Sequence, residues 1–176
     1  MIDLFLPFIL GVSIGINPPV DSSDSMETTV NSNVSPAVEA VSDTNATGRT
    51  PEPQVATGKF TTALEIRPIL GMTKTSWAVV RLYDGQDLVY FTHLMAWRCG
   101  LWEIRYGVNG DPADTIMPME PCNEEFAQPN VMNDIENFLP YVSFPGESIT
   151  SVQVEITYDD GMIEVAQFER GEILIP

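Results

Sequence analysis

The stretch that decides the fold reads SWAVVRLYDGQDLVYFTHLM and covers residues 76–95. Two runs rich in β-branched and aromatic residues, 76–83 and 86–95, flank Asp84-Gly85. Asp-Gly is a strong hairpin signal because a type I′ turn needs positive φ at both central residues. Pairing outward from the turn sets Leu82 opposite Asp87, Val80 opposite Val89 and Ala78 opposite Phe91. Both faces are largely apolar, which predicts a hairpin inside a sheet and not at its edge.

Further alternating segments follow downstream. Residues 101–108 precede Asn109-Gly110, and residues 152–158 precede Asp160-Gly161. In the second segment the alternation sets on one face Val152, Val154, Ile156 and Tyr158. Return strands are expected at 115–119, where flanking prolines favour a sheet edge, and at 162–168. Short strands are expected at 141–144 and 173–175, and helical turns before prolines at 60–66 and 133–139. Seven or eight short strands with one or two short helical turns predict an all-β fold, an antiparallel β-sandwich that is Ig-like only in a loose sense.

The composition argues against several classes of function. The 176 residues carry 25 acidic and 8 basic side chains, a formal net charge of −17. This balance argues against nucleic-acid binding, which needs a basic face to displace counterions from phosphates. One histidine and two cysteines leave little material for a zinc site or a thiol nucleophile.

Residues 4–16, LFLPFILGVSIGI, are apolar or small and uncharged. Thirteen residues are too few to span a bilayer, which takes about 20, but they match the apolar region of a secretory signal. Ser13 and Gly15 suit the small positions of a cleavage site. Residues 1–3 hold no Lys or Arg, so the alternatives are a weak signal, an uncleaved membrane tether, a start farther upstream, or a buried segment of the domain. We expect a signal-like segment over 1–16 and a periplasmic or secreted protein.

Residues 17–57 contain no Phe, Trp, Tyr, Leu or Ile but 12 Ser or Thr and 5 Pro. Such a stretch cannot bury enough apolar surface to offset the entropy of ordering it. We therefore predict a disordered acidic linker over 17–57. The domain itself is expected over 58–176, which hold all three Trp and all five Tyr.

Three segments together resemble small uncharacterised exported proteins predicted in alphaproteobacterial genomes. They are residues 80–110 (VRLYDGQDLVYFTHLMAWRCGLWEIRYGVNG), 118–122 (PMEPC) and 155–161 (EITYDDG). The resemblance implies an exported bacterial setting. It implies no catalytic residue, because that group has no assigned activity.

Cys99 and Cys122 are the two cysteines. In an exported protein such a pair usually forms a disulfide, which would stabilise this loop by about 3 kcal/mol. The alternative is two free thiols in a cytosolic protein.

Charge is divided unevenly between the two halves of the domain. Residues 58–110 hold six basic and four acidic residues, net +2, whereas 111–176 hold one basic and fourteen acidic, net −13. Arginine and aromatic residues are favoured at binding hot spots. The alternative is that the arginines neutralise the acidic half within the fold. The predicted binding residues are Arg81, Tyr83, Tyr90, Arg98, Trp102 and Arg105.

Acidic loops raise the possibility of Ca²⁺, for which Asp111, Asp114, Asp159 and Asp160 are the candidate ligands. Turn formation by Asp explains the same stretches without a metal, and no other cofactor is expected. His93 has no partner motif for nucleophilic catalysis, and the pairs Asp84/Asp87 and Glu155/Glu164 are expected on solvated surfaces.

The sequence thus favours an exported, non-catalytic binding or structural accessory module. Its partner would be an unknown protein or cell-envelope ligand and not nucleic acid. The alternative is an extracytoplasmic hydrolase that uses carboxylates or Ca²⁺.

Overall fold

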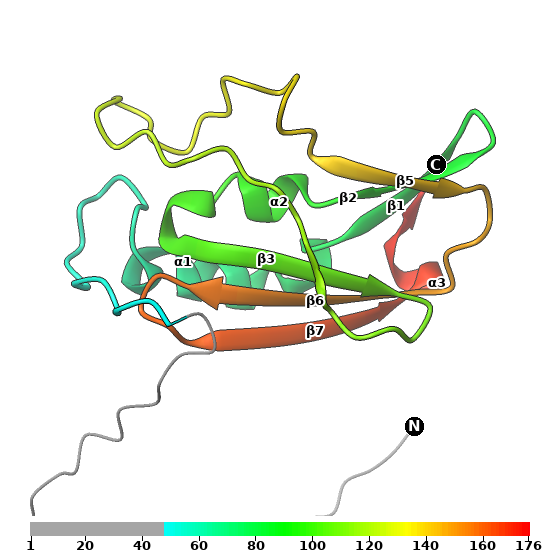
Figure 1. Cartoon of the computed structure of the whole chain (residues 1–176), viewed down its shortest axis with the longest axis horizontal. Coiled ribbons are helices and arrows are strands. Elements are labelled where there is room, and N and C mark those ends of the chain that lie inside the picture. Colours follow the sequence, from blue (N-terminus) through cyan, green and yellow to red (C-terminus); the bar gives the residue numbers. More distant parts are fainter. Residues whose placement is uncertain (1–47) are drawn as a thin grey trace, which may run out of the picture. The chain divides into compact units, whose positions relative to one another are not determined.

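A computed structural model describes residues 48–176. The signal-like segment 1–16 and residues 17–47 of the predicted linker lie outside the described residues. Within 48–176, eight strands form two four-stranded sheets: sheet A, in the order β5-β2-β1-β8, and sheet B, in the order β4-β3-β6-β7 (Figure 1). The predicted all-β sandwich is confirmed.

The strands are β1 (Val79–Tyr83), β2 (Gln86–Tyr90), β3 (Leu101–Val108), β4 (Thr115–Ile116), β5 (Tyr141–Pro145), β6 (Ser151–Tyr158), β7 (Ile163–Glu169) and β8 (Leu174–Ile175). The helices are α1 (Ala63–Met72), α2 (Thr92–Met95) and α3 (Arg170–Ile173), with 3₁₀ turns η1 (Lys74–Ser76) and η2 (Arg98–Gly100).

The first hairpin has the predicted register. Val80 pairs with Val89, and Asp84 and Gly85 have φ of 48° and 74°, as a type I′ turn requires. The hairpin lies between β5 and β8, so its predicted central position is confirmed. The ladder stops one pair short of Phe91, whose N–H donates to the Pro140 carbonyl at 2.8 Å. The chain then turns into α2, which places His93 on a helix and not in the β-rich run predicted over 86–95.

The other two hairpins also form as predicted. Asn109 and Gly110, with φ of 58° and 90°, join β3 to the two-residue edge strand β4. Around the last turn, the Tyr158 N–H donates to the Met162 carbonyl at 2.9 Å, and β6 pairs with β7. β8 runs parallel to β1 and completes sheet A.

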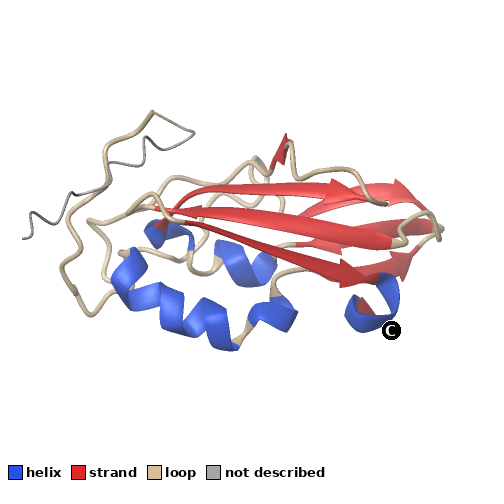
Figure 2. Ribbon diagram, turned by 90° about the horizontal axis from the view of Figure 1, so that it is seen from below, coloured by secondary structure: helices blue, strands red, loops and turns tan. Residues whose placement is uncertain are grey.

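A continuous apolar core joins both sheets to the helices. Figure 2 shows the helices gathered on one side of the strands. The inward-facing residues of β6 are the predicted set, Val152, Val154, Ile156 and Tyr158, and all are buried. They pack with the apolar side of α1 and with residues of α2, β1 and β2 in one cluster.

Helix α1 extends beyond the predicted turn and contains Pro68. Proline lacks an N–H, so the Leu64 carbonyl one turn earlier loses its helical partner. Leu64 and Pro68 both lie on the exposed side of the helix, where water can bind that carbonyl. Ile66 and Leu70 are fully buried on the opposite side, and this burial outweighs the lost hydrogen bond.

The last residues of the predicted linker lie along the domain. Glu52 N–H donates to the Asp159 carbonyl at 2.9 Å. The Gln54 amide donates to Asp159 Oδ1 at 2.8 Å and accepts from the Leu64 N–H at 2.8 Å. These contacts connect residues 48–57 to the start of α1, so the ordered chain begins before residue 58.

Asp87 is fully buried on the inner side of β2, which corrects its expected place on a solvated surface. Arg170, directly after β7, donates to both carboxylate oxygens at 2.6 and 2.8 Å. The Ile149 N–H adds a third bond at 3.0 Å. Hydrogen bonding from Arg170 lowers the pKa of Asp87 from its ordinary 3.8 to about 2. The pair connects the two sheets through the core.

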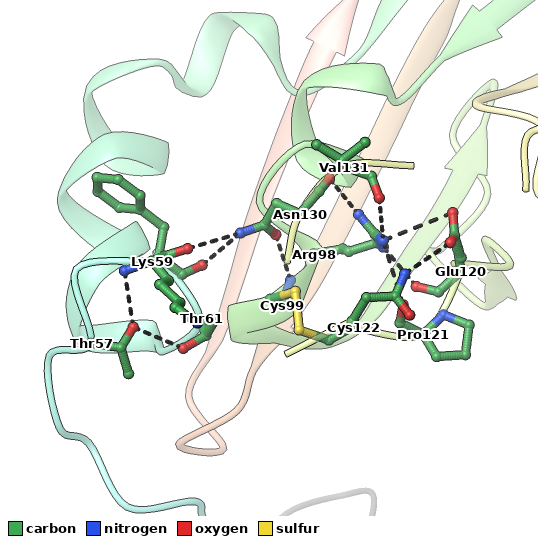
Figure 3. Close-up of a disulfide and its surroundings, with 12 residues drawn as sticks. Thr57, Lys59, Thr61, Arg98, Cys99, Glu120, Pro121, Cys122, Asn130 and Val131 are labelled. Carbon is green, nitrogen blue, oxygen red and sulfur yellow. Dashed lines mark hydrogen bonds and ion pairs between the residues drawn. A yellow bond between two sulfur atoms is a disulfide. The ribbon is translucent and has the colours of Figure 1, made fainter. Parts of the chain in front are cut away.

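Cys99 and Cys122 form the predicted disulfide, with Cα atoms 4.9 Å apart (Figure 3). Beside it, Arg98 is 2% exposed and donates to the carbonyls of Glu120 at 2.7 Å and Asn130 at 2.5 Å. The Asn130 side chain accepts from the Cys99 N–H at 3.0 Å. The disulfide and Arg98 together hold the long segment after Cys122 that has no strand ladder of its own.

We expect Asp87→Asn to lower the free energy of unfolding by about 3 kcal/mol, because it leaves the Arg170 charge without its counterion. Since the folded pKa of Asp87 is depressed, the carboxylate stabilises the wild type by about 2 kcal/mol above pH 4, and this is lost as the pH falls toward 2. Urea unfolding between pH 7 and 2 measures both effects. Asp84→Asn, the same change at an exposed turn, is the matched control, and equal losses in the two variants would contradict the assignment.

Reduction of the disulfide should lower the thermal midpoint by several degrees, because it removes about 3 kcal/mol of loop-closure stabilisation. Hydrogen exchange should accelerate first in residues 120–140, since only hydrogen bonds, chiefly those of Arg98 and Asn130, then hold that segment. The double variant Cys99→Ala/Cys122→Ala should match the reduced protein. Unchanged exchange over 120–140 in either sample would contradict the prediction.

Candidate binding surface

The outer face of sheet A carries three rows of side chains that cross the strands. The first row aligns Val79, Tyr90 and Tyr141 on β1, β2 and β5. The two tyrosine rings lie 5.1 Å apart at 48°. The second row contains Ile175, Arg81, Leu88 and Ser143, and the third Tyr83, Gln86 and Pro145. Residues four apart on one strand are separated by about 13 Å, which sets the distance between the outer rows.

A hollow of about 420 Å³ lies between the first and third rows. It is lined by Arg81, Tyr83, Asp84, Gln86, Leu88, Tyr90, Tyr141 and Ser143. A second hollow of about 340 Å³ adjoins it and shares two of its residues; it is lined by Val79, Arg81, Tyr90, Thr92 and Ile175. The two hollows extend across the width of sheet A.

Arg81 lies in the middle of this surface. Its guanidinium is 5.5 Å from the centre of the Tyr83 ring, which is itself 60% exposed. No Asp or Glu among residues 48–176 forms an ion pair with Arg81. In a chain of net charge −17, this arginine is a cation available to a ligand.

The six predicted binding residues do not form one surface. Arg81, Tyr83 and Tyr90 meet on sheet A, whereas Trp102 and Arg105 belong to β3 in sheet B. The Trp102 indole donates to Glu52 at 2.9 Å, and Arg49 lies over its ring.

Two of the predicted arginines are already occupied by partners within the domain. Arg105 is paired with Glu103, whose hydrogen bond raises the pKa of Arg105. Arg98 is buried and holds loop carbonyls, so it is not part of any surface. Carbonyls that lack a ladder partner need donors, and a guanidinium supplies five.

Sequence reasoning missed Tyr141, Gln86 and Ser143. Tyr141 begins a strand that the sequence does predict, but the pairing of that strand with β2 depends on a connection of fifty residues, 91–140. Hairpin turns encode only neighbouring pairs, so no local signal brings Tyr141 to Tyr90.

The four candidate Ca²⁺ ligands do not converge. Asp111 and Asp114 are exposed in a turn, and their N–H groups donate to the carbonyls of Val108 and Pro112. Asp160 is paired with Arg67. Over residues 48–176 there is no group of three His, Cys, Asp or Glu that could hold a metal ion.

Asp159 is buried and acts at the start of α1. Its Oδ1 accepts from the Ala63 N–H at 2.8 Å and from Gln54 at 2.8 Å. Burial raises the pKa of this carboxyl group. Asp159 thus accepts from a free N–H group in the first turn of α1, and through Gln54 it holds the preceding segment against the helix.

The candidate carboxylate pairs are separated. Glu155 pairs with Val165 and Glu164 with Ile156, so the two glutamates lie on opposite faces of sheet B. Glu164 instead accepts from Lys74 at 2.7 Å and from the Tyr158 hydroxyl at 2.9 Å.

The only histidine is also in a structural setting. His93 Nε2 is hydrogen-bonded to the Thr73 hydroxyl at 2.7 Å, and burial lowers the pKa of the ring. Cys99 is in the disulfide and offers no thiol to it.

No protein-family model, curated protein or solved structure matches the chain. None of the helices in the described part of the chain is long and apolar enough to cross a membrane.

We expect His93→Gln to leave the outer face of sheet A unchanged and to alter the pH dependence of stability. The folded pKa of His93 is depressed, so protonation favours the unfolded state and stability falls as the pH drops below 6.5. Glutamine removes this contribution and keeps a polar group near Thr73. Thermal melts of the wild type and the variant from pH 7.5 to 5 measure this pH dependence of stability. A wild-type-like slope in the variant would show that another group titrates.

Proposed function

We propose that this protein is an exported, non-catalytic binding module that holds a saccharide chain of the bacterial cell envelope on the outer face of sheet A. One observation carries the proposal. Seven of the eight residues that line the larger hollow have a polar group, and three of those seven are tyrosines. The eighth, Leu88, is the only purely apolar one.

Sugars match this mixture of surfaces. A pyranose ring has an apolar C–H face that packs on an aromatic ring, and a rim of hydroxyls that donate and accept hydrogen bonds. Tyr90 and Tyr141 supply adjacent rings in one row, and Tyr83 supplies a third about 13 Å away. The guanidinium of Arg81 lies between the two outer rows, and the amide of Gln86 lies beside Tyr83 in the third row, so both can meet the hydroxyls.

A protein interface fits this surface less well. Stable interfaces bury about 800 Å² on each partner around an apolar, desolvated centre. Here the centre of the array is Leu88, already 8% exposed, and its neighbours carry hydroxyl, amide, carboxylate and guanidinium groups. Burial of so many polar tips under a flat partner would leave several of them without hydrogen bonds.

Export is supported by separate observations. A disulfide is consistent with an extracytoplasmic location, because cytosolic thiols are kept reduced. The apolar segment 4–16 matches a secretory signal, and the resemblance to exported alphaproteobacterial proteins agrees with it. We therefore propose a periplasmic or secreted protein of a bacterium.

Co-sedimentation with purified peptidoglycan sacculi tests this function, with cellulose and chitin as comparison polymers. We expect the protein to sediment with sacculi and the double variant Tyr90→Ala/Tyr141→Ala to bind at least about tenfold more weakly, because two stacking contacts are lost.

Phe126→Ala, at an exposed ring that lines neither hollow, is the matched control and should bind like the wild type. Equal retention of the double variant and the wild type would overturn the site. Absence of the wild type from all three polymer pellets would overturn the ligand class.

A further inference from the structure

β7 presents the longest free strand edge of the domain. It is the outermost strand of sheet B and has seven residues, whereas the other outermost strands have two, two and five (Figure 1). β5, the five-residue strand, also ends in Pro145. Proteins commonly shield such edges by shortening them or placing proline there. β7 has neither protection.

The phase of the hydrogen bonds shows which groups face outward. The Tyr158 N–H donates to Met162 at one end of the β6–β7 pair, and the Arg170 N–H donates to Thr150 at the other. Ladder bonds alternate along an antiparallel strand, so the N–H and C=O groups of the even-numbered residues in β7 point toward β6. Ile163, Val165 and Gln167 therefore direct their N–H and C=O groups away from the sheet. No bond to these six groups is present among residues 48–176.

A groove of about 340 Å³ runs beside this edge. One wall is β7 and the other is formed by η1 and α3; the lining residues are Lys74, Thr75, Val165, Ala166, Gln167, Phe168, Glu172 and Ile173. Ala166, Phe168 and Ile173 make the floor apolar. A free strand edge beside an apolar groove accepts an extended peptide, which pairs through its backbone and places alternate side chains in the groove.

We propose that a basic, extended segment of another polypeptide adds to β7 as a fifth strand of sheet B. Its alternate residues are small and apolar and enter the groove, and the intervening residues carry positive charge. This site is separate from the proposed saccharide surface and does not depend on it.

Charge favours a basic segment over two other possible occupants, the N-terminal part of this chain and a second copy of it. The acidic side chains around the groove are Glu164, Glu169 and Glu172. The two cations there are already paired, Lys74 with Glu164 and Arg170 with Asp87. Residues 17–47 of this chain hold five carboxylates and no Lys, Arg or His, so they are repelled. A second copy of the chain brings a net charge of −17. The negative potential around the groove weakens the binding of residues 17–47 and of a second copy, and it strengthens the binding of a basic segment.

The test uses a fluorescein-labelled heptapeptide of alternating lysine and valine, with blocked ends, added to the full chain. Fluorescence anisotropy should show saturable binding that weakens at least about tenfold between 50 and 500 mM salt, because exposed charges are then screened. A heptapeptide of alternating glutamate and valine should not bind.

Hydrogen exchange gives the decisive readout. Without peptide, the amides of Glu164, Ala166 and Phe168 should be protected and those of Ile163, Val165 and Gln167 should exchange rapidly. With the lysine–valine peptide, the second set should slow at least about tenfold. Binding without this alternation would place the peptide elsewhere and overturn the proposal. Protection of the second set in the protein alone, rising with its concentration, would assign the edge to a second copy.

Val165→Pro removes one outward N–H that makes no bond within the domain, and it should abolish peptide binding. Val165→Thr keeps that N–H and the shape of the side chain, and it should bind within about twofold of the wild type. If the proline variant does not fold, the exchange pattern of the wild type still decides. Equal affinity of a folded proline variant and the wild type would overturn the proposal.

Discussion

The ion pair between the buried carboxylate of Asp87 and the partly buried Arg170 is the constraint on which the sandwich depends. Asp87 lies inside the first hairpin, and Arg170 follows the last strand of sheet B, so 83 residues of chain are closed by one contact. Arg170 also donates to the Ile149 carbonyl, while Asp87 accepts from the Ile149 N–H. With both charges and this backbone satisfied, α3 can turn the chain so that β8 joins β1. An apolar pair could fill the same space, but it would not set the direction of the chain.

Buried charged side chains also bond the backbone in segments that have no strand pairing. Asp159 is buried and satisfies the first turn of α1, and Arg98 is buried and satisfies the carbonyls of the segment after Cys122. In each place an irregular segment would otherwise bury unpaired backbone groups, each at a cost of about 1 to 3 kcal/mol. Charged side chains that look like surface residues in the sequence are thus part of the framework, together with the disulfide.

Once these charges are assigned, the surfaces left for ligands are few and physically different. The outer face of sheet A offers rings, hydroxyls and one unpaired guanidinium, which suit a ligand that is apolar on one side and polar at its rim. The edge of β7 offers backbone groups beside an apolar groove in an acidic surrounding, which suits a basic strand. They lie on different sheets, so the two ligands that we propose would not compete for one surface.

Local chemistry in the sequence determined the hairpins, their register and the inward face of β6, because turn residues and period-two patterns act between neighbours. The disulfide also followed from the cysteine count, taken with the expectation of an exported protein. Tertiary structure alone decided that Arg98 and Asp87 are buried, that α1 continues through Pro68, and that Tyr141 lies beside Tyr90. Each of these depends on a contact between distant segments, whose free energy comes from desolvation and packing that no local pattern records.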